Sequence, residues 1–277
     1  MKLYNTFQHI KGISKFDERI ILNSDSNNWD KFLENPVTKI SENKISNILE
    51  ELPESKKNYK KRNHKYFYDR LKASLHWRLF PDFIDKLVYI DIETTGFSPI
   101  DNDVTLISIY KNKSIKTFIK DDNLLEFKKE LEEDDILVSY NGKNFDIPFI
   151  NKNLNFKLNH TQIDLRWMMH NLGISGGLKS SEQYFSIDRK SSTEIDGLMA
   201  VKLWNYYNSF HDINALNILI YYNQEDTVNL EQLLHVAYNY AIKYMYVNKK
   251  KVVRPKRPTL KKIVDEKTIE IMINNLI

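Results

Sequence analysis

The sequence predicts an α/β protein in which helices cover a mixed β-sheet. Two observations carry this prediction. Residues 85–141 read mainly as short apolar segments separated by turn residues, which is typical of strands, whereas residues 177–245 read mainly as helices. A strand–helix–strand order in the middle of the chain adds one crossover, so parallel and antiparallel pairing should coexist. With 277 residues, of which 42% are hydrophobic, the chain can bury a large core and form a smaller module.

The first 54 residues predict a small helical module that precedes the sheet. NNWDKFLE and ISENKISNILEEL predict two helices, with Ser41 and either Asn27 or Asn28 as candidate N-caps. The preceding FQHIKGISKFDERIIL predicts two short helical patterns joined by a turn at Gly12.

Two segments concentrate positive charge, although the formal net charge of the chain is only +4. Residues 55–79 carry nine Lys or Arg and one acid, and residues 248–262 carry eight Lys or Arg and no acid. The first segment is predicted to be helical from Tyr66 to Leu79. Its interleaved aromatic residues are Tyr59, Tyr66, Phe67, Tyr68 and Trp77. The composition fits phosphate neutralisation with base stacking, but a solvated surface or linker fits it as well, and several aromatics must pack against the domain.

The sheet is predicted to begin at Asp85. DKLVYIDIE, DVTLISIYK and SIKTFIK predict three antiparallel strands, DNLLEFKKELEE an amphipathic helix and DILVSYN a fourth strand. NFDIPFINKNLN then predicts a helix, HTQIDL a short strand, and the remaining segments are helical. The terminal TIEIMINNLI fits a strand by its alternation and a helix by its length and position. We divide the chain into a helical module with its basic connection (1–82), the sheet domain (83–246) and a basic tail (247–277).

Four acids lie beside apolar sequence rather than in charged runs: Asp91, Glu93, Asp146 and Asp226. Asp91 and Glu93 are two residues apart on a predicted strand, so their side chains share one face. Clustered buried carboxylates raise one another's pKa, and this repulsion disfavours folding unless cations compensate it. Mg²⁺ and Mn²⁺ prefer carboxylate oxygens, and two such ions roughly 4 Å apart can activate water for phosphodiester cleavage. The four acids are therefore candidate metal ligands.

Three motifs that contain these acids resemble the motifs of the DEDD 3′–5′ exonucleases. Asp91-Ile-Glu93-Thr-Thr-Gly resembles the first, Asn141-Gly-Lys-Asn-Phe-Asp146 the second, and Tyr222-Asn-Gln-Glu-Asp226 the third in its tyrosine version. The histidine version carries a His five residues before the last Asp, where this sequence has Tyr221. The order of all three motifs, rather than any single one, carries the resemblance.

Over roughly residues 5–240 the chain also resembles the YprB-like, ribonuclease H-like domain proteins, through HWRLFPDFIDKLVYIDIETTG, NGKNFDIPFI, HTQIDL and GGLKSSEQYFSIDR. This resemblance implies a ribonuclease H-like mixed sheet flanked by helices, with the acids meeting at one end. It also implies a metal-dependent 3′–5′ exonuclease that hydrolyses phosphodiester bonds at single-stranded or frayed ends. The implied cofactor is Mg²⁺ or Mn²⁺, as two ions, and the implied partner is DNA or RNA.

The resemblance assigns roles by position. The catalytic residues would be Asp91, Glu93, Asp146, Tyr222 and Asp226, and the four acids among them would be the metal ligands. With an ordinary pKa of about 10, Tyr222 fits positioning of the attacking water better than proton abstraction, and a core aromatic is the alternative. The residues that would contact nucleic acid are Thr94, Thr95, Gly96, Asn141, Asn144, Phe145 and Lys179. Phe145 fits core packing as well as base stacking.

Composition also excludes some classes. The chain has no Cys, so disulfides, thiolate metal sites and Cys nucleophiles are excluded. No apolar run approaches the roughly 20 residues that span a bilayer, and MKLYNTFQHIKGI lacks the apolar core of a signal peptide, so we expect a cytoplasmic protein without a membrane partner. The rival hypothesis is a nucleic-acid-binding module that keeps the fold without turnover, which salt-dependent binding without cleavage would select.

Overall fold

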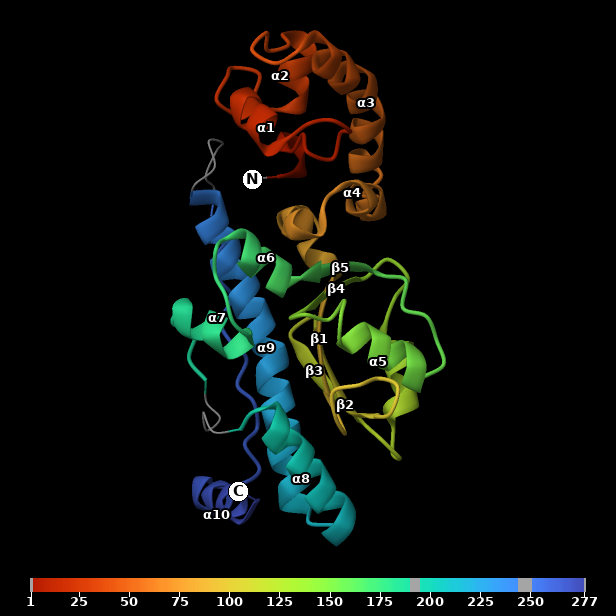
Figure 1. The fold of residues 1–277 in the computed structure, drawn as a ribbon, viewed down its shortest axis with the longest axis vertical. Helices are drawn as coiled ribbons and strands as arrows, with labels where there is room; N and C mark the ends of the chain where they lie inside the picture. Colours follow the sequence, from red (N-terminus) through yellow and green to blue (C-terminus); the bar gives the residue numbers. More distant parts are fainter. Residues whose placement is uncertain (1, 190–194, 244–250, 277) are drawn as a thin grey trace.

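The computed structural model describes residues 2–189, 195–243 and 251–276, and its centre is a five-stranded sheet (Figure 1). The strands are β1 (Leu87–Thr94), β2 (Val104–Lys111), β3 (Ser114–Ile119), β4 (Ile136–Ser139) and β5 (Thr161–Asp164). Their order is β3-β2-β1-β4-β5, with antiparallel β1-β2 and β2-β3 pairs and parallel β1-β4 and β4-β5 pairs. The mixed sheet and its covering helices confirm the predicted α/β class.

Helices cover both faces of the sheet (Figure 1). One face carries α5 (Asp146–Asn153) and the 3₁₀ helix η4 (Leu124–Glu130), and α9 (Ile213–Lys243) crosses the other. The side chains of Val88, Ile90 and Ile92 pack into the cluster on the α5 side. Because side chains alternate along a strand, Asp91 and Glu93 face α9.

Strand direction brings the ends of distant segments together. Because β1, β4 and β5 run in the same direction, β4 and β5 end at Ser139 and Asp164, one residue beyond the Tyr89–Val138 pair and therefore next to Asp91 in the middle of β1. The crossover from β4 to β5 passes through α5, as the sequence predicts. The first residue of this helix, Asp146, therefore follows the carboxyl end of β4, on the side toward which β1 continues through Asp91 and Glu93.

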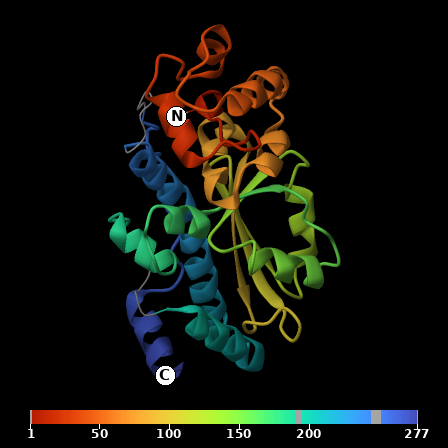
Figure 2. The ribbon, with the colours of Figure 1, turned by 45° about the horizontal axis from the view of Figure 1, so that its top comes forward.

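The N-terminal helices gather at one end of the molecule, while α8 and α10 lie at the other (Figures 1 and 2). The N-terminal elements are η1 (Leu3–Asn5), α1 (Lys15–Leu22), α2 (Trp29–Glu34), α3 (Glu42–Lys60), α4 (His64–Arg70), η2 (Ala73–Asp82) and η3 (Ile84–Lys86). Asn28 caps α2 by accepting a hydrogen bond from the Lys31 amide. Ser41 precedes α3, but its side chain makes no capping hydrogen bond.

The prediction of one continuous helix over 66–79 is wrong. The helix α4 ends at Arg70, and Leu71 takes an extended conformation before the chain resumes as η2. The His76 Nε2 atom lies 3.1 Å from the Tyr68 carbonyl oxygen and 3.0 Å from the Leu71 carbonyl oxygen. The imidazole thus binds carbonyls that an ended helix leaves without intrahelical partners.

In the basic segment 55–79 some side chains pack within the protein, as expected for several of its aromatics, while most of its Lys and Arg are exposed, so nucleic-acid binding by the segment stays a prediction. Arg78 forms a buried, two-point ion pair with Glu18, with N–O distances of 2.8 and 2.9 Å. Phe67 and Trp77 are buried, so these two aromatics pack rather than offer stacking platforms. The exposed cations of the segment include Lys60 and Lys61.

The second half of the chain is helical, as predicted. Its remaining elements are α6 (Leu165–Asn171), α7 (Leu178–Tyr184), α8 (Gly197–Phe210) and α10 (Glu266–Leu276). The terminal segment is therefore a helix rather than a strand, whereas the amphipathic helix expected over 122–133 is the 3₁₀ helix η4. The predicted boundary at 246/247 and residues 248–250 of the basic tail lie outside the described residues. Within the described ranges, no helix is both long enough and apolar enough to span a membrane.

One hydrophobic core extends from the N-terminal helices into the sheet domain. The same cluster contains Trp29 and Phe32 of α2, Tyr89 of β1 and Leu233 of α9. The module and the sheet domain therefore stabilise each other through continuous apolar packing. The domain boundary after residue 82 stays a prediction.

Candidate active site

The Asp91 carboxylate lies beneath α9. Its Oδ2 atom accepts a 2.7 Å hydrogen bond from Asn223 Nδ2 of that helix. Across the sheet, Asp91 lies opposite Ser108 of β2, whose hydroxyl is 2.7 Å from Thr117 Oγ1 on β3. Thr117 also accepts a 3.0 Å hydrogen bond from Gln224 Nε2 of α9. A row of polar groups therefore crosses three strands under α9 and fixes the helix over the acids of β1.

Asp146 is held at the start of α5 by a tight approach of the backbone. A Cβ atom on Gly142 would lie 2.1 Å from Ser139 Oγ and 3.6 Å from Asp146 Cγ, so the turn between β4 and α5 requires glycine here. Asp146 is only 3% exposed, and its Oδ1 atom has no hydrogen-bond partner among the described residues. A buried oxygen without a partner disfavours the folded state, so this atom is suited to receive a ligand.

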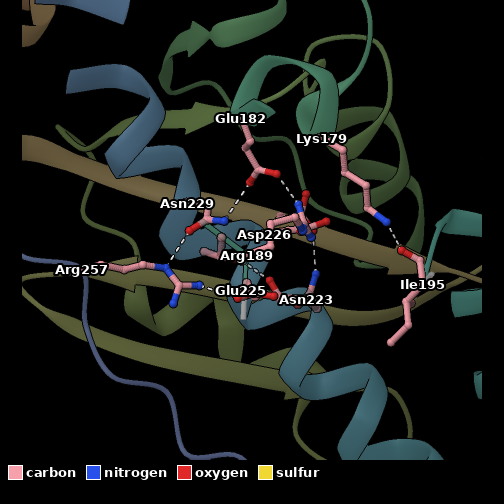
Figure 3. Close-up of polar contacts among 11 residues, drawn as sticks. Lys179, Glu182, Arg189, Ile195, Asn223, Glu225, Asp226, Asn229 and Arg257 are labelled. Atoms are coloured by element: carbon pink, nitrogen blue, oxygen red, sulfur yellow. Dashed lines mark hydrogen bonds and ion pairs between the residues drawn. The ribbon is translucent and has the colours of Figure 1, made fainter. Parts of the chain in front are cut away.

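The third motif lies on α9, where Tyr222 and Asp226 are one helical turn apart and both are buried. Arg189 donates hydrogen bonds both to Asp226 and to Glu182 of α7 (Figure 3). The Arg189 Cζ atom lies 5.8 Å from the centroid of the Tyr222 ring, and Lys179 Nζ lies 5.4 Å from it. Two cations thus border Tyr222, and one of them is paired with the last acid of the motifs.

Burial raises the pKa of all four acids, and the charges of neighbouring acids raise the pKa of Asp91 and Glu93 further. Burial is the largest cause for Asp91 and Glu93, whose pKa values are raised well above the ordinary range, and the charge of Asp226 is the next. Burial raises the pKa of Asp146 to about 7. Burial also raises the pKa of Asp226, although Arg189 opposes this shift. The charges of Asp226 and Asp146 raise the pKa of both Asp91 and Glu93. Acids from β1, α5 and α9 therefore belong to one electrostatic site.

The Tyr222 phenol is kept protonated. Burial, followed by the charges of Asp226 and Glu93, raises its pKa far above neutrality. A phenol that does not ionise near neutral pH can donate a hydrogen bond but cannot act as a general base. The buried position supports a positioning role and is also compatible with the core-aromatic alternative.

Three of the predicted nucleic-acid contacts form the turn after β1. The Thr94 hydroxyl donates a 2.6 Å hydrogen bond to the Gly96 carbonyl, and the Thr95 hydroxyl lies 3.3 Å from Asn102 Oδ1. A Cβ on Gly96 would lie 2.4 Å from the same Asn102 atom, so a glycine closes this turn. The turn is thus internally ordered at the edge of the sheet where the acids lie.

The second motif forms another ordered turn. The backbone N–H of Asn141 donates a 2.8 Å hydrogen bond to Asp164 Oδ1 at the end of β5. Asn141 has a left-handed backbone conformation with φ of +70°. Asn144 is exposed. Phe145 is half-buried, with its ring centroid 4.8 Å from that of Phe149 in the core. These contacts favour core packing for Phe145 over base stacking.

The sequence-based predictions omit three residues that contact the site: Asn223, Arg189 and Glu182. Asn223 lies inside the third motif, where a fully buried amide in an apolar helix is a signal of a specific partner. Arg189 and Glu182 lie together in EQYFSIDR, but only the fold brings this pair to Asp226 (Figure 3).

The donor chemistry of the site fits a hard divalent cation. Carboxylate oxygens are the preferred ligands of Mg²⁺ and Mn²⁺, and Asp146 Oδ1 is an unused one. In the part of the chain that the structure describes, no three acidic or imidazole side chains already surround one ion position. Asp91 is bound by Asn223 and Asp226 by Arg189, so both contacts must adjust before the carboxylates converge on an ion.

The comparison with protein families agrees with the fold. The model of the RNase H superfamily matches residues 88–238, which run from β1 into α9 and include all four acids. Among solved structures, the family B DNA polymerase from the hyperthermophilic archaeon Pyrobaculum calidifontis is similar at 16% identity with a TM-score of 0.40. The match covers 55% of this chain and 26% of the polymerase chain, so it spans about a quarter of the length of the polymerase. A search of curated proteins finds no match. Since the family model covers more than half of the sequence, the predicted ribonuclease H-like fold is confirmed, and the chain belongs to the RNase H superfamily.

Proposed function

We propose that this protein is a metal-dependent 3′–5′ exonuclease of the DEDD type, in its tyrosine version, and a YprB-like member of the superfamily. It would shorten single-stranded or frayed ends of DNA or RNA. One observation supports this proposal most strongly: buried acids from β1, α5 and α9 lie close enough that the charges of Asp226 and Asp146 raise the pKa of Asp91 and Glu93. A charge cluster of this kind is stable when it binds cations, and superfamily membership agrees with a nucleic-acid substrate.

The proposed ligands of Mg²⁺ or Mn²⁺ are Asp91, Glu93, Asp146 and Asp226. Two bound ions would supply the positive charge that favours ionisation of the attacking water and stabilises the leaving oxygen. The water oxygen bonds to the phosphorus of the last phosphodiester as the bond from phosphorus to the 3′ oxygen breaks. One proton of the water ends on that 3′ oxygen, and a nucleoside 5′-monophosphate is released. Tyr222 donates a hydrogen bond that orients the water or the phosphate, because burial keeps its phenol protonated. The turn 94–96 contributes backbone groups beside the terminal nucleotide.

A second function, nucleic-acid binding without turnover, is favoured by one contact. Asp226 is already paired with Arg189, and the described acids do not yet surround an ion. In this alternative the acidic site is permanently neutralised by arginine. Affinity would come from exposed cations such as Lys60 and Lys61, and it would fall steeply with salt.

End-labelled oligonucleotides distinguish the two functions. With 5′-labelled DNA and RNA and millimolar Mn²⁺ or Mg²⁺, the exonuclease should give a ladder that shortens from the 3′ end. The double variant Asp91→Asn/Asp226→Asn should lose at least about 100-fold in rate. Asp101→Asn, which removes an exposed acid from the turn after β1, is the control and should cleave normally. Trimming that persists in the double variant contradicts the proposal, and salt-dependent binding without shortening selects the binding module.

A further inference from the structure

Arg189 joins two carboxylates of different character. Its Nη1 group binds Glu182 and its Nη2 group binds Asp226, and the arginine side chain is only 8% exposed (Figure 3). Glu182 belongs to none of the three motifs, whereas Asp226 is a proposed metal ligand. One guanidinium therefore links the catalytic acids to a carboxylate outside them.

The Glu182 carboxylate is fixed independently of Arg189. Its Oε1 atom accepts a 2.8 Å hydrogen bond from Asn229 Nδ2 of α9, and the Asn229 side-chain oxygen accepts a 2.8 Å hydrogen bond from Arg257 Nε (Figure 3). Arg257 also pairs with the fully buried Glu225 through a 2.7 Å contact. This network extends from the segment after residue 250 and holds Glu182 in place whether or not Asp226 keeps its partner.

The donor groups of Arg189 are not all used. Its Nε atom is buried and has no hydrogen-bond partner among the described residues. In a guanidinium group, Nε–H and Nη2–H lie along one edge and match two oxygens of a phosphate. On this edge, Nη2 donates to one oxygen of Asp226, while Nε has no partner among the described residues. Two oxygens of a phosphate could accept from both donors, which a single carboxylate oxygen does not.

We propose that Arg189 is a phosphate-binding residue that shares Asp226 with the metal ion. In the metal-free protein, its Nη2 group neutralises Asp226. When a divalent cation takes the Asp226 carboxylate, like charges repel the guanidinium, and Glu182 keeps it beside the site. The Nε and Nη2 edge then binds non-bridging oxygens of the phosphate at the 3′ end. This inference rests on the proposed exonuclease function and explains why the described acids do not already surround an ion.

Two binding measurements test the proposal without relying on turnover. Calorimetric titration of Mn²⁺ into protein without nucleic acid should show that Arg189→Gln binds Mn²⁺ about 5–150-fold more tightly than the wild type, because no ion pair has to break. Fluorescence anisotropy then measures binding of an oligonucleotide in Ca²⁺, with a phosphorothioate at the terminal linkage to suppress cleavage. There, Arg189→Gln should lose roughly tenfold or more in affinity. Arg189→Lys keeps the charge but not the two-donor edge, so its affinities for Mn²⁺ and for the oligonucleotide should lie between those of the wild type and Arg189→Gln.

The opposite signs of these changes separate the proposal from a folding defect, which would weaken both kinds of binding. Arg19→Gln removes an exposed arginine of α1, outside the basic segments and the site, and is the matched control, expected to leave both affinities unchanged. The proposal is overturned if Arg189→Gln binds Mn²⁺ no more tightly than the wild type, or binds the oligonucleotide equally well. If those results are found while the wild type trims oligonucleotides in a metal-dependent way, the proposed role of Arg189 is rejected and the exonuclease proposal stands. If the wild type binds no Mn²⁺, the exonuclease proposal falls with it.

Discussion

Replacing Asp146 by Asn should make the metal-free protein more stable at alkaline pH. Burial raises the pKa of Asp146 from 3.8 to about 7, so between these values the folded state holds a proton that the unfolded chain has released. The free energy of unfolding of the wild type must therefore fall as pH rises from about 4 to about 7. One pKa unit corresponds to about 1.4 kcal/mol, so a shift of roughly three units sets an upper limit of about 4 kcal/mol. Asn carries no charge and does not incur this loss.

Urea denaturation in EDTA, repeated from pH 4.5 to pH 8.5, measures the effect. The other acids of the site give both proteins a similar slope, so the informative quantity is the difference between wild type and Asp146→Asn. This difference should be small at pH 4.5 and should favour the variant by up to about 4 kcal/mol at pH 8.5. Asp122→Asn, at an exposed turn, should follow the wild type at every pH. Parallel curves for wild type and Asp146→Asn, or a variant that is less stable at pH 8.5, would refute the reasoning.

Three further outcomes follow from the fold. Glu18→Gln breaks a buried ion pair and should lower the free energy of unfolding by roughly 3–5 kcal/mol in urea titrations; a loss below 1 kcal/mol would show that the pair is dispensable. Gly142→Ala places a Cβ 2.1 Å from Ser139 Oγ and should cost about 1–3 kcal/mol, while Gly197→Ala, with nothing within 4 Å, should be neutral or stabilising; equal effects would contradict the tight turn. Changing both lysines of residues 60–61 to Ala should reduce the salt slope of single-strand binding by about 1.4 if both touch phosphate, and an unchanged slope removes them from the interface.

The sheet could be predicted because its signals are local. The alternation in β1 places Val88, Ile90 and Ile92 on one face and Asp91 and Glu93 on the other, and this follows from strand geometry alone. The apolar and acidic pattern therefore predicts the strand and its acidic face, whereas the packing of α9 on that face is known from the fold.

The helix break after Arg70 could not be predicted from periodicity. The apolar spacing continues through the break, but the side chain of His76 binds backbone carbonyls and stabilises an extended turn. The 3₁₀ helix η4 is a similar case, because amphipathic spacing alone does not separate it from an α-helix.

The acids of the candidate site were accessible to sequence reasoning, whereas their partners were not. Each acid lies in a short motif, and its neighbours in sequence indicate a buried carboxylate. Arg189 reaches Asp226 across 37 residues, and Asn223 reaches Asp91 across 132 residues. Pairings at such separations depend on how α7 and α9 pack on the sheet, which no local pattern specifies. The ion pair of Arg78 in the basic segment could not be predicted for the same reason, since its buried partner lies 60 residues away.

Anomalous diffraction from crystals soaked in Mn²⁺ tests the central claim most directly. We expect a strong anomalous peak bounded by carboxylate oxygens of Asp91, Glu93, Asp146 and Asp226, with Arg189 withdrawn from Asp226. Crystals of Asp91→Asn/Asp226→Asn should lack this peak. A peak found only elsewhere, or four acids that stay empty at millimolar Mn²⁺ while Arg189 keeps its contact, would contradict the proposed metal centre.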